Sequence, residues 1–329
     1  MLNPNLKLNP KVFDEDPEQR ATREGYGEGL VELGEKNKDV VVLTADLSES
    51  TQTEEFEKKF PERFFECGVA EQNMAAIAAG LGVSGKIPFI SSYATFSPGK
   101  NWETIRTTII YNQSNVKIAG HHSGVVTGPD GATHQATEDI AITRAWPGLT
   151  IFVPCDAIEA KKATIKSAEI EGPVYLRFTR DKTPVITTDE THFEVGKIQT
   201  FWDSENPQTV IFATGHILYN ALLAAKELEK ENVHVLVANV STVKPIDEKS
   251  IIELSKKTGT IVTVEDHQVM GGLGGAIAEV LAKNNPTPME FVGLQDTFAE
   301  SGTPKELMAK YKMDAPSIIE AVKKVIARK

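Results

Sequence analysis

The sequence predicts an α/β protein of two domains, each a mainly parallel sheet flanked by helices. Short apolar runs recur along the chain, helical patterns separate them, and 329 residues exceed the length of one ordinary domain. Strands that are buried on both faces and alternate with helices are typical of parallel sheets. A polar stretch near the middle divides the pattern into domains at 1–187 and 188–329.

The first domain opens with a polar, irregular arm and a helix over 20–35, whose inward side carries Leu30, Val31 and Leu33. Further helices are predicted over 101–112 and 157–167. Its strands are predicted from the apolar runs 40–44, 64–67, 87–90, 116–119, 151–153 and 174–178. These elements fit one open sheet.

Residues 184–208 are polar and predict a linker. The second domain then repeats the α/β pattern, with strands at 209–213, 233–237, 260–264 and 289–292 and helices at 218–230, 247–257, 275–283 and 315–327. The glycine cluster 271–275 predicts a tight turn. It is not a dinucleotide fingerprint, because Ile277 stands where the third glycine would be.

Charge and composition exclude several classes of partner. Forty-six acidic residues against thirty-five Lys plus Arg give a net charge of −11, which disfavours nucleic acid and anionic membranes. No apolar run approaches the ~20 residues that span a bilayer, and the first residues lack an apolar signal region, so a cytoplasmic protein is predicted. Cys67 and Cys155 have no metal spacing and are interpreted as small buried residues in a reducing compartment.

The stretch 66–82 joins a predicted strand to a helix and places Glu71 in the first helical turn. A carboxylate there is either a charge favoured by the helix dipole or a proton carrier tuned by burial. One helical face carries Ala70, Met74, Ile77, Ala78 and Leu81, and the other keeps only small residues. Such a helix can pack closely on more than one side.

Ligands of open parallel sheets bind beyond the carboxyl ends of the strands. The residues at those positions in the first domain are polar or aromatic: Asp46, Ser48 and Ser50, then Glu71, then Tyr93 and Phe96, then His121 and His122, then Arg180 and Asp181, with Asp130 and His134 in the loop after the fourth strand. This edge of the sheet is therefore the predicted site.

Three of the seven histidines lie in one loop, which suits proton transfer or hydrogen bonding to a substrate oxygen. Zinc is disfavoured, because the loop lacks the H-E-x-x-H spacing and a cysteine pair. Arg180 is either a surface charge or a phosphate ligand. Tyr93 and Phe96 stand in a Ser/Thr-rich loop, where aromatic faces suit stacking on a flat ligand.

The segment Gly68–Met74, followed by an Ala/Gly helix, resembles the pyrimidine-binding domain of transketolase. The segments 45–50, 91–96 and 128–135 match other motifs of that family in its order. The second domain resembles the family's Rossmann-like carboxy-terminal domain, so the resemblance covers the whole chain.

The resemblance implies a thiamine diphosphate enzyme that transfers a two-carbon ketol unit from a ketose phosphate to an aldose phosphate. Glu71 would bond the aminopyrimidine ring nitrogen, Tyr93 and Phe96 would stack on the ring, and Asp46 would complete the cofactor set. The implied substrate ligands are Arg23, Ser50, His122 and Arg180 for the sugar phosphate, Asp130 for a sugar hydroxyl, and His134, also catalytic, near the reacting oxygen.

One family motif is missing: no Gly-Asp-Gly with a downstream Asn is present to hold Mg²⁺ and the diphosphate. The chain therefore resembles the carboxy-terminal subunit of a split transketolase, whose amino-terminal partner subunit carries that site. The implied assembly contains two copies of each chain, with self-pairing through the helix after Glu71. Pro129, Ala132 and Ser123 depart from the family pattern and leave loop geometry and acceptor preference open.

Other interpretations share this fold. The beta subunit of a 2-oxoacid dehydrogenase has the same two domains, and deoxyxylulose phosphate synthase shares part of the 130–134 segment. That segment and the phosphate ligands favour transketolase. A non-catalytic regulatory or binding subunit is the alternative outside enzymes, and the presence of Glu71, Tyr93 and Phe96 argues against it.

Overall fold

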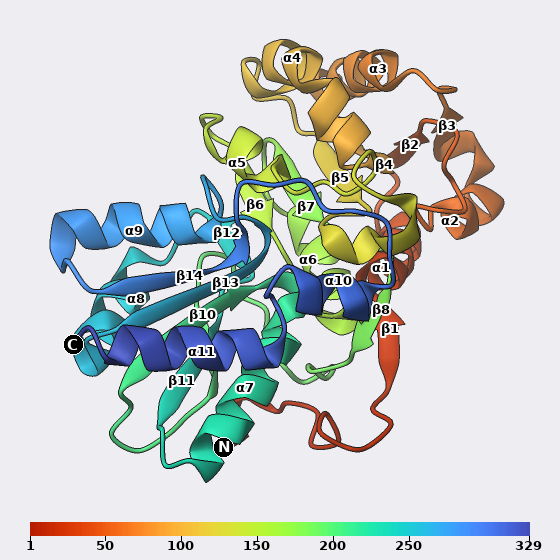
Figure 1. The fold of residues 1–329 in the computed structure, drawn as a ribbon. Helices are drawn as coiled ribbons and strands as arrows, with labels where there is room; N and C mark the ends of the chain where they lie inside the picture. Colours follow the sequence, from red (N-terminus) through yellow and green to blue (C-terminus); the bar gives the residue numbers. More distant parts are fainter.

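The computed structural model describes residues 1–329 as two α/β units that lie side by side (Figure 1). The first sheet has the strand order β12-β6-β7-β5-β4-β2-β3, and the second has the order β14-β13-β10-β11-β9. The predicted fold class, two units with mainly parallel sheets, is confirmed. None of the helices has the length and apolar character needed to cross a membrane.

Six strands of the first sheet are parallel and come from the first unit: β2 (Val40–Thr44), β3 (Phe64–Glu66), β4 (Ile87–Tyr93), β5 (Lys117–His121), β6 (Thr150–Phe152) and β7 (Val174–Arg177). Successive side chains of a strand point to opposite faces of the sheet, so apolar strands form a core on each face. On β2, Val40 and Val42 pack against α1 (Thr22–Lys36) and α6 (Ala157–Ser167), whereas Val41 and Leu43 pack toward α3 (Glu71–Val83). The sheet is therefore buried on both sides, as its apolar strands predicted.

Helix α1 approaches α6 closely because its facing positions are glycines. A Cβ on Gly25 would lie 1.8 Å from the carbonyl oxygen of Ala157. The same face buries Tyr26 and Leu30, whereas Val31, predicted to point inward, is only half-buried. This close packing fixes the first turn of α1, which carries Arg23, against the sheet.

The predicted inward stripe of α3 is wrong in part. The helix buries Glu71, Met74, Ala75, Ala78 and Ala79, while Ile77 is 39% exposed. Alanines allow the helix backbone to approach β4 closely, so the alanine face rather than Ile77 faces the sheet. The opposite face of α3 stays uncovered in the single chain.

Other local predictions also need correction. Cys67 is only half-buried, because β3 is an exposed edge strand, whereas Cys155 is buried. The predicted helix 101–112 is a short α-helical turn, α4 (Trp102–Thr104), followed by π-helical turns over Ile105–Ile110. The structure also contains elements that were not predicted: α2 (Glu54–Lys59), α5 (Asp139–Arg144), α10 (Pro304–Lys310), β1 (Gln19–Ala21) and β8 (Lys182–Pro184).

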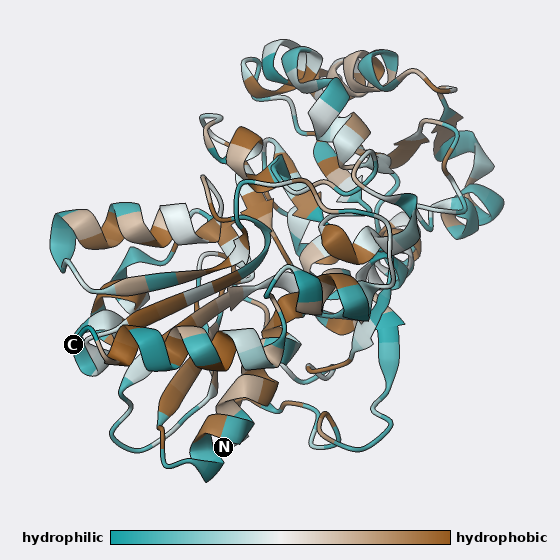
Figure 2. Cartoon of the chain, in the orientation of Figure 1, coloured by the Kyte–Doolittle hydropathy of each residue, from teal (hydrophilic) through white to brown (hydrophobic).

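The second unit has the same three-layer plan, with apolar strands between amphipathic helices (Figure 2). Helices α7 (Leu218–Lys230) and α11 (Ala315–Ile326) cover one face, and α8 (Glu248–Thr258) and α9 (Leu273–Asn284) cover the other. Its parallel strands are β10 (Thr209–Thr214), β11 (Val235–Asn239), β13 (Ile261–Gln268) and β14 (Met289–Leu294). The glycine turn predicted over 271–275 is confined to its first two residues, because α9 already begins at Leu273, and Gly271 has a φ of +77°.

The stretch predicted as a linker, 184–208, is structured in part. Residues Gln199–Trp202 form β9, which pairs antiparallel with β11 at the edge of the second sheet. The amino-terminal arm also packs on this unit, since the backbone N–H of Asn3 donates to the carbonyl of Phe201 at 2.9 Å and Val12 is buried in the core of the second unit. This strand was not predicted, because the stretch is mostly polar and only the last two residues of β9 are buried.

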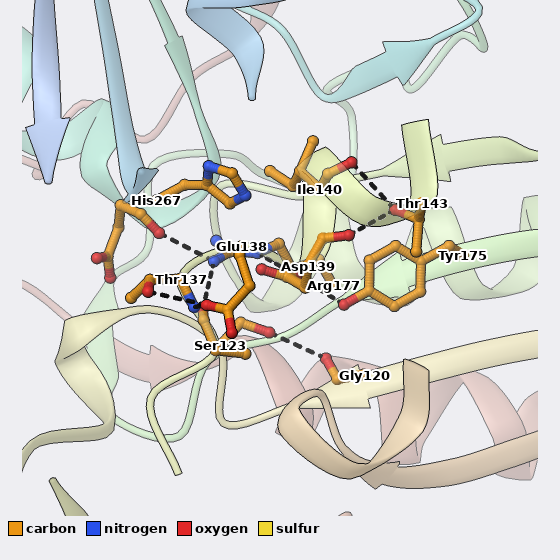
Figure 3. A network of polar contacts seen from close by, with 12 residues as sticks. Gly120, Ser123, Thr137, Glu138, Asp139, Ile140, Thr143, Tyr175, Arg177 and His267 are labelled. Atoms are coloured by element: carbon orange, nitrogen blue, oxygen red, sulfur yellow. Dashed lines mark hydrogen bonds and ion pairs between the residues drawn. The ribbon is translucent and has the colours of Figure 1, made fainter. Parts of the chain in front are cut away.

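The two units are joined by one strand that crosses from the second unit to the first sheet, and by a buried polar network. Strand β12 (Thr242–Lys244), from the second half of the chain, pairs antiparallel with β6 at the edge of the first sheet. In Figure 3, Asp139 of α5 lies between Tyr175 and Arg177 of β7. Its Oδ2 accepts from the Tyr175 hydroxyl at 2.6 Å and from Arg177 Nε at 2.8 Å. Arg177 Nη2 also donates to the carbonyl of Asp266 in β13, across the junction, at 2.9 Å.

A second buried contact across the junction involves Glu159 of α6. Its carboxylate accepts from the Cys155 backbone N–H at 2.7 Å and from Asn239 Nδ2, at the end of β11, at 2.9 Å. Burial, and then the charge of Asp156, raises the pKa of Glu159 to about 7. Folding therefore makes this carboxyl hold its proton to a higher pH than in the unfolded chain.

This shift predicts a pH-dependent effect of Glu159→Gln on stability. Between the unfolded pKa of 4.5 and the folded pKa of about 7, the folded wild type binds a proton that the unfolded chain has released, so its stability falls as the pH rises. The variant cannot titrate and should gain on the order of 3 kcal/mol relative to wild type between about pH 5 and about pH 8. Urea unfolding at both pH values measures the difference.

Glu171→Gln is the matched control, because Glu171 is exposed near the end of the same helix, and it should show no such trend. A difference between Glu159→Gln and wild type that does not change with pH would contradict the raised pKa.

Candidate active site

The carboxyl ends of the parallel strands meet around a polar cavity of about 360 Å³ in the first unit. It collects side chains from α1, the loop after β2, the end of β4 and the loops after β5 and β7. All five residues predicted only as substrate ligands line it: Arg23, Ser50, His122, Asp130 and Arg180. Tyr93, Glu49 and Gln52 complete the lining. The structure thus brings together residues that are spread over 158 positions of the sequence, from 23 to 180.

Two guanidinium groups give the cavity its charge. Arg23 Nη1 donates to the carbonyl of Ser50 at 2.8 Å, while its buried Nε has no partner in the chain. Arg180 lies 4.0 Å from Asp130 through Nε and Oδ2, a loose ion pair. Burial, and then the charge of Arg180, lowers the pKa of Arg23. Two arginines held this close favour an anionic ligand.

His122 stands between these cations and the aromatic loop. Its ring stacks on Tyr93 with a centroid distance of 3.7 Å, and its Nδ1 is buried without a partner. Burial, followed by the charges of Arg23, Arg180 and His134, lowers the pKa of His122 to about 3. The imidazole is therefore neutral at neutral pH and can donate from one ring nitrogen only.

The aromatic loop and the last predicted histidine form a continuous cluster beside the cavity. Tyr93 and Phe96 are near-parallel with centroids 5.8 Å apart, and His134 meets both rings edge-on at 5.8 and 5.5 Å. The Thr133 hydroxyl lies 2.8 Å from His134 Nδ1, which orients the imidazole. Phe96 and His134 do not line the cavity itself.

Glu71 opens α3 and is 2% exposed. Its Oε2 accepts from Lys100 Nζ at 2.7 Å, and Asn101 Nδ2 donates to its backbone carbonyl at 3.0 Å. Lys100 and Asn101 directly follow the turn that carries Phe96, so the carboxylate and the aromatic loop are tied together. Sequence reasoning missed Lys100. The contact joins residues 29 positions apart, so no local pattern in the sequence indicated it.

These residues fit one end of a thiamine diphosphate molecule. A nearly buried carboxylate can accept from a ring N–H, and a near-parallel aromatic pair can pack on a flat ring. The chain contains no group of three or more His, Cys, Asp or Glu side chains that could hold a metal ion. Asp46, predicted as a cofactor ligand, is exposed outside the cavity, and its backbone N–H donates to Glu66 Oε1 at 2.8 Å.

Two family models of known proteins match this chain. Residues 18–185 match the family model of the transketolase pyrimidine-binding domain. The chain belongs to the transketolase family. Residues 199–318 match the family's carboxy-terminal domain, which confirms the resemblance inferred from the motifs. Membership makes the chain part of a thiamine-dependent transferase family.

The relatives include chains of the same length. The transketolase C-terminal section of Methanocaldococcus jannaschii is 45% identical over 92% of this chain and 95% of its own. The 6-deoxy-6-sulfo-D-fructose transketolase subunit of Clostridium sp. (strain MSTE9) is 36% identical over 96% of this chain and 98% of its own. A solved structure described as a split-gene transketolase, an inactive beta4 tetramer, is 45% identical with a TM-score of 0.87, covering 93% of this chain and 98% of that one.

The electrostatics of the cavity generate a prediction for His122. In the free chain its imidazole should remain neutral from about pH 8 down to about pH 5, whereas free histidine in the same sample titrates near 6.5. Arg180→Met removes one of the cations and should raise the pKa of His122, and added inorganic phosphate should act in the same direction. NMR of the isotope-labelled imidazole measures the pKa of His122 in the free chain, in Arg180→Met and with added phosphate. A His122 that titrates with free histidine would show that the arginines do not act on it.

Proposed function

We propose that this chain is the carboxy-terminal subunit of a thiamine diphosphate-dependent transketolase that transfers a two-carbon ketol unit between sugar phosphates. The observation that carries the proposal is the cavity, where Arg23, Arg180 and His122 lie beside the aromatic loop tied to Glu71. The arrangement offers an anion site next to a site for a flat heterocycle. A transketolase needs both at one place.

Bound thiamine diphosphate would supply the carbanion chemistry, and the side chains would bind, orient and move protons. Glu71 would accept the hydrogen bond of the pyrimidine ring nitrogen, displacing or sharing the bond from Lys100. Phe96 would pack against that ring. His134, oriented by Thr133, would donate to or accept from the sugar oxygen that reacts.

The substrate would be held by charge and by shape. Arg23 and Arg180 would bind the phosphate, and Ser50 and the neutral His122 would add hydrogen bonds. Asp130, only loosely paired with Arg180, would keep lone pairs for a sugar hydroxyl. The named substrate of the Clostridium relative is also an anionic keto sugar, which supports an anionic substrate class here.

The diphosphate and Mg²⁺ would be held by an amino-terminal partner subunit. This follows from the lack of a metal-binding group of side chains in this chain. The uncovered face of α3, with Ile77 at its centre and Val69 and Val83 near its ends, is the proposed contact between two copies of this chain. An assembly of two copies of each subunit would bury roughly 2,000 Å² or more per permanent interface. The cytoplasmic location stays a prediction.

The first test is the partner requirement. The purified chain with thiamine diphosphate and Mg²⁺ should show no ketol transfer, and addition of the amino-terminal subunit from the same source should restore it. The reason is that one end of the cofactor has no anchor in this chain. A coupled assay of ketose and aldose phosphates measures the transfer. Full activity of this chain alone would overturn the proposal.

The second test is Glu71→Gln in the reconstituted complex. A glutamine cannot take up and release the proton that the pyrimidine needs, so deuterium exchange at the reactive carbon of the thiazolium ring should slow by roughly 10²- to 10⁴-fold. Glu103→Gln, an exposed neighbour without an ion pair, is the control and should exchange at the wild-type rate. Equal rates for Glu71→Gln and wild type would remove Glu71 from the mechanism.

A further inference from the structure

Tyr93 and Phe96, the two aromatic residues of the loop, differ in their surroundings. It is the last residue of β4, and its register partner on β5 is His121, the residue before His122. Tyr93 lines the cavity together with both arginines, whereas Phe96 does not. Only one of the two aromatic residues of the loop therefore lines the cavity, although their rings are near-parallel.

The ring of Tyr93 forms one wall of the cavity. It stacks on His122 at a centroid distance of 3.7 Å and an interplanar angle of 22°. This stacking holds the imidazole, whose ring would otherwise be free to rotate, in one orientation toward Arg23 and Arg180.

The Tyr93 hydroxyl is available to a ligand. The two fully buried tyrosines use their hydroxyls within the chain: Tyr26 bonds Ser91 Oγ at 2.6 Å and Tyr175 bonds Asp139 at 2.6 Å. Tyr93 makes no such bond and is only partly buried. Tyr93 lines the same cavity as Arg23 and Arg180.

We propose that Tyr93 is a substrate-binding residue: its hydroxyl donates to the anionic group held by Arg23 and Arg180. The proposal deepens the function proposed above and rests on it for the substrate class. It replaces the cofactor-stacking role that the sequence predicted for Tyr93, and leaves that role to Phe96.

The test compares two variants of the reconstituted complex, Tyr93→Phe and Phe96→Leu. Tyr93→Phe removes one hydrogen bond to a charged group, so the affinity for fructose 6-phosphate and for inorganic phosphate should fall by roughly 10- to 100-fold. The affinity for thiamine diphosphate should not change. Phe96→Leu should show the reverse pattern, with weaker cofactor binding and unchanged phosphate binding.

Binding is measured by calorimetry before turnover, so the result does not depend on the transferase assay. If wild type bound fructose 6-phosphate but transferred no ketol unit, the proposed reaction would fail while the role of Tyr93 could still be read. Unchanged phosphate affinity in Tyr93→Phe would overturn the inference. A parallel loss of cofactor affinity in Tyr93→Phe would return Tyr93 to the cofactor.

Discussion

The buried guanidinium of Arg177 is the contact on which the arrangement of the site depends. It donates to Asp139 Oδ2 of α5, to the carbonyl of Ala136 in the loop after His134, and to the carbonyl of Asp266 in the second unit. Burial alone would lower the pKa of Arg177, but the charge of Asp139 and its hydrogen bond raise it above the ordinary value. Because a buried charge without its partner is strongly destabilising, these three segments must keep their relative positions.

The second unit holds the same loop from its other side. Asp266 Oδ1 accepts from the backbone N–H of Val125 at 2.9 Å. Gln135 Nε2 donates to the carbonyl of Glu300, in the loop before α10, at 3.1 Å. The segment that carries Asp130 and His134 thus lies between β7 on one side and, in the second unit, β13 and the loop before α10 on the other. The carboxy-terminal domain therefore shapes the cavity, although no residue beyond Arg180 lines it.

The cavity holds two arginines, Arg23 and Arg180, beside the carboxylates of Glu49 and Asp130, in a chain whose net charge is −11. Many of the exposed acids are paired with lysine or arginine on the surface, as Glu279 is with Arg144. Charges farther away than about 8 Å are largely screened at physiological salt, so the two arginines inside the cavity decide which ligand is favoured there. The net charge is a property of the whole chain and does not describe the charges inside the cavity.

The sequence alone determined the α/β class, the parallel strands and the edge of the sheet where ligands bind, because apolar runs and helical periodicity are local properties. The resemblance of the sequence to transketolase grouped Arg23, Ser50, His122, Asp130 and Arg180 as implied substrate ligands. Only the tertiary structure decided which face of α3 is buried, how β9 and β12 pair, and that Lys100 binds Glu71. It also separated Tyr93 from Phe96. Those features depend on contacts between segments that are distant in the sequence. Local sequence patterns do not specify how such segments pack.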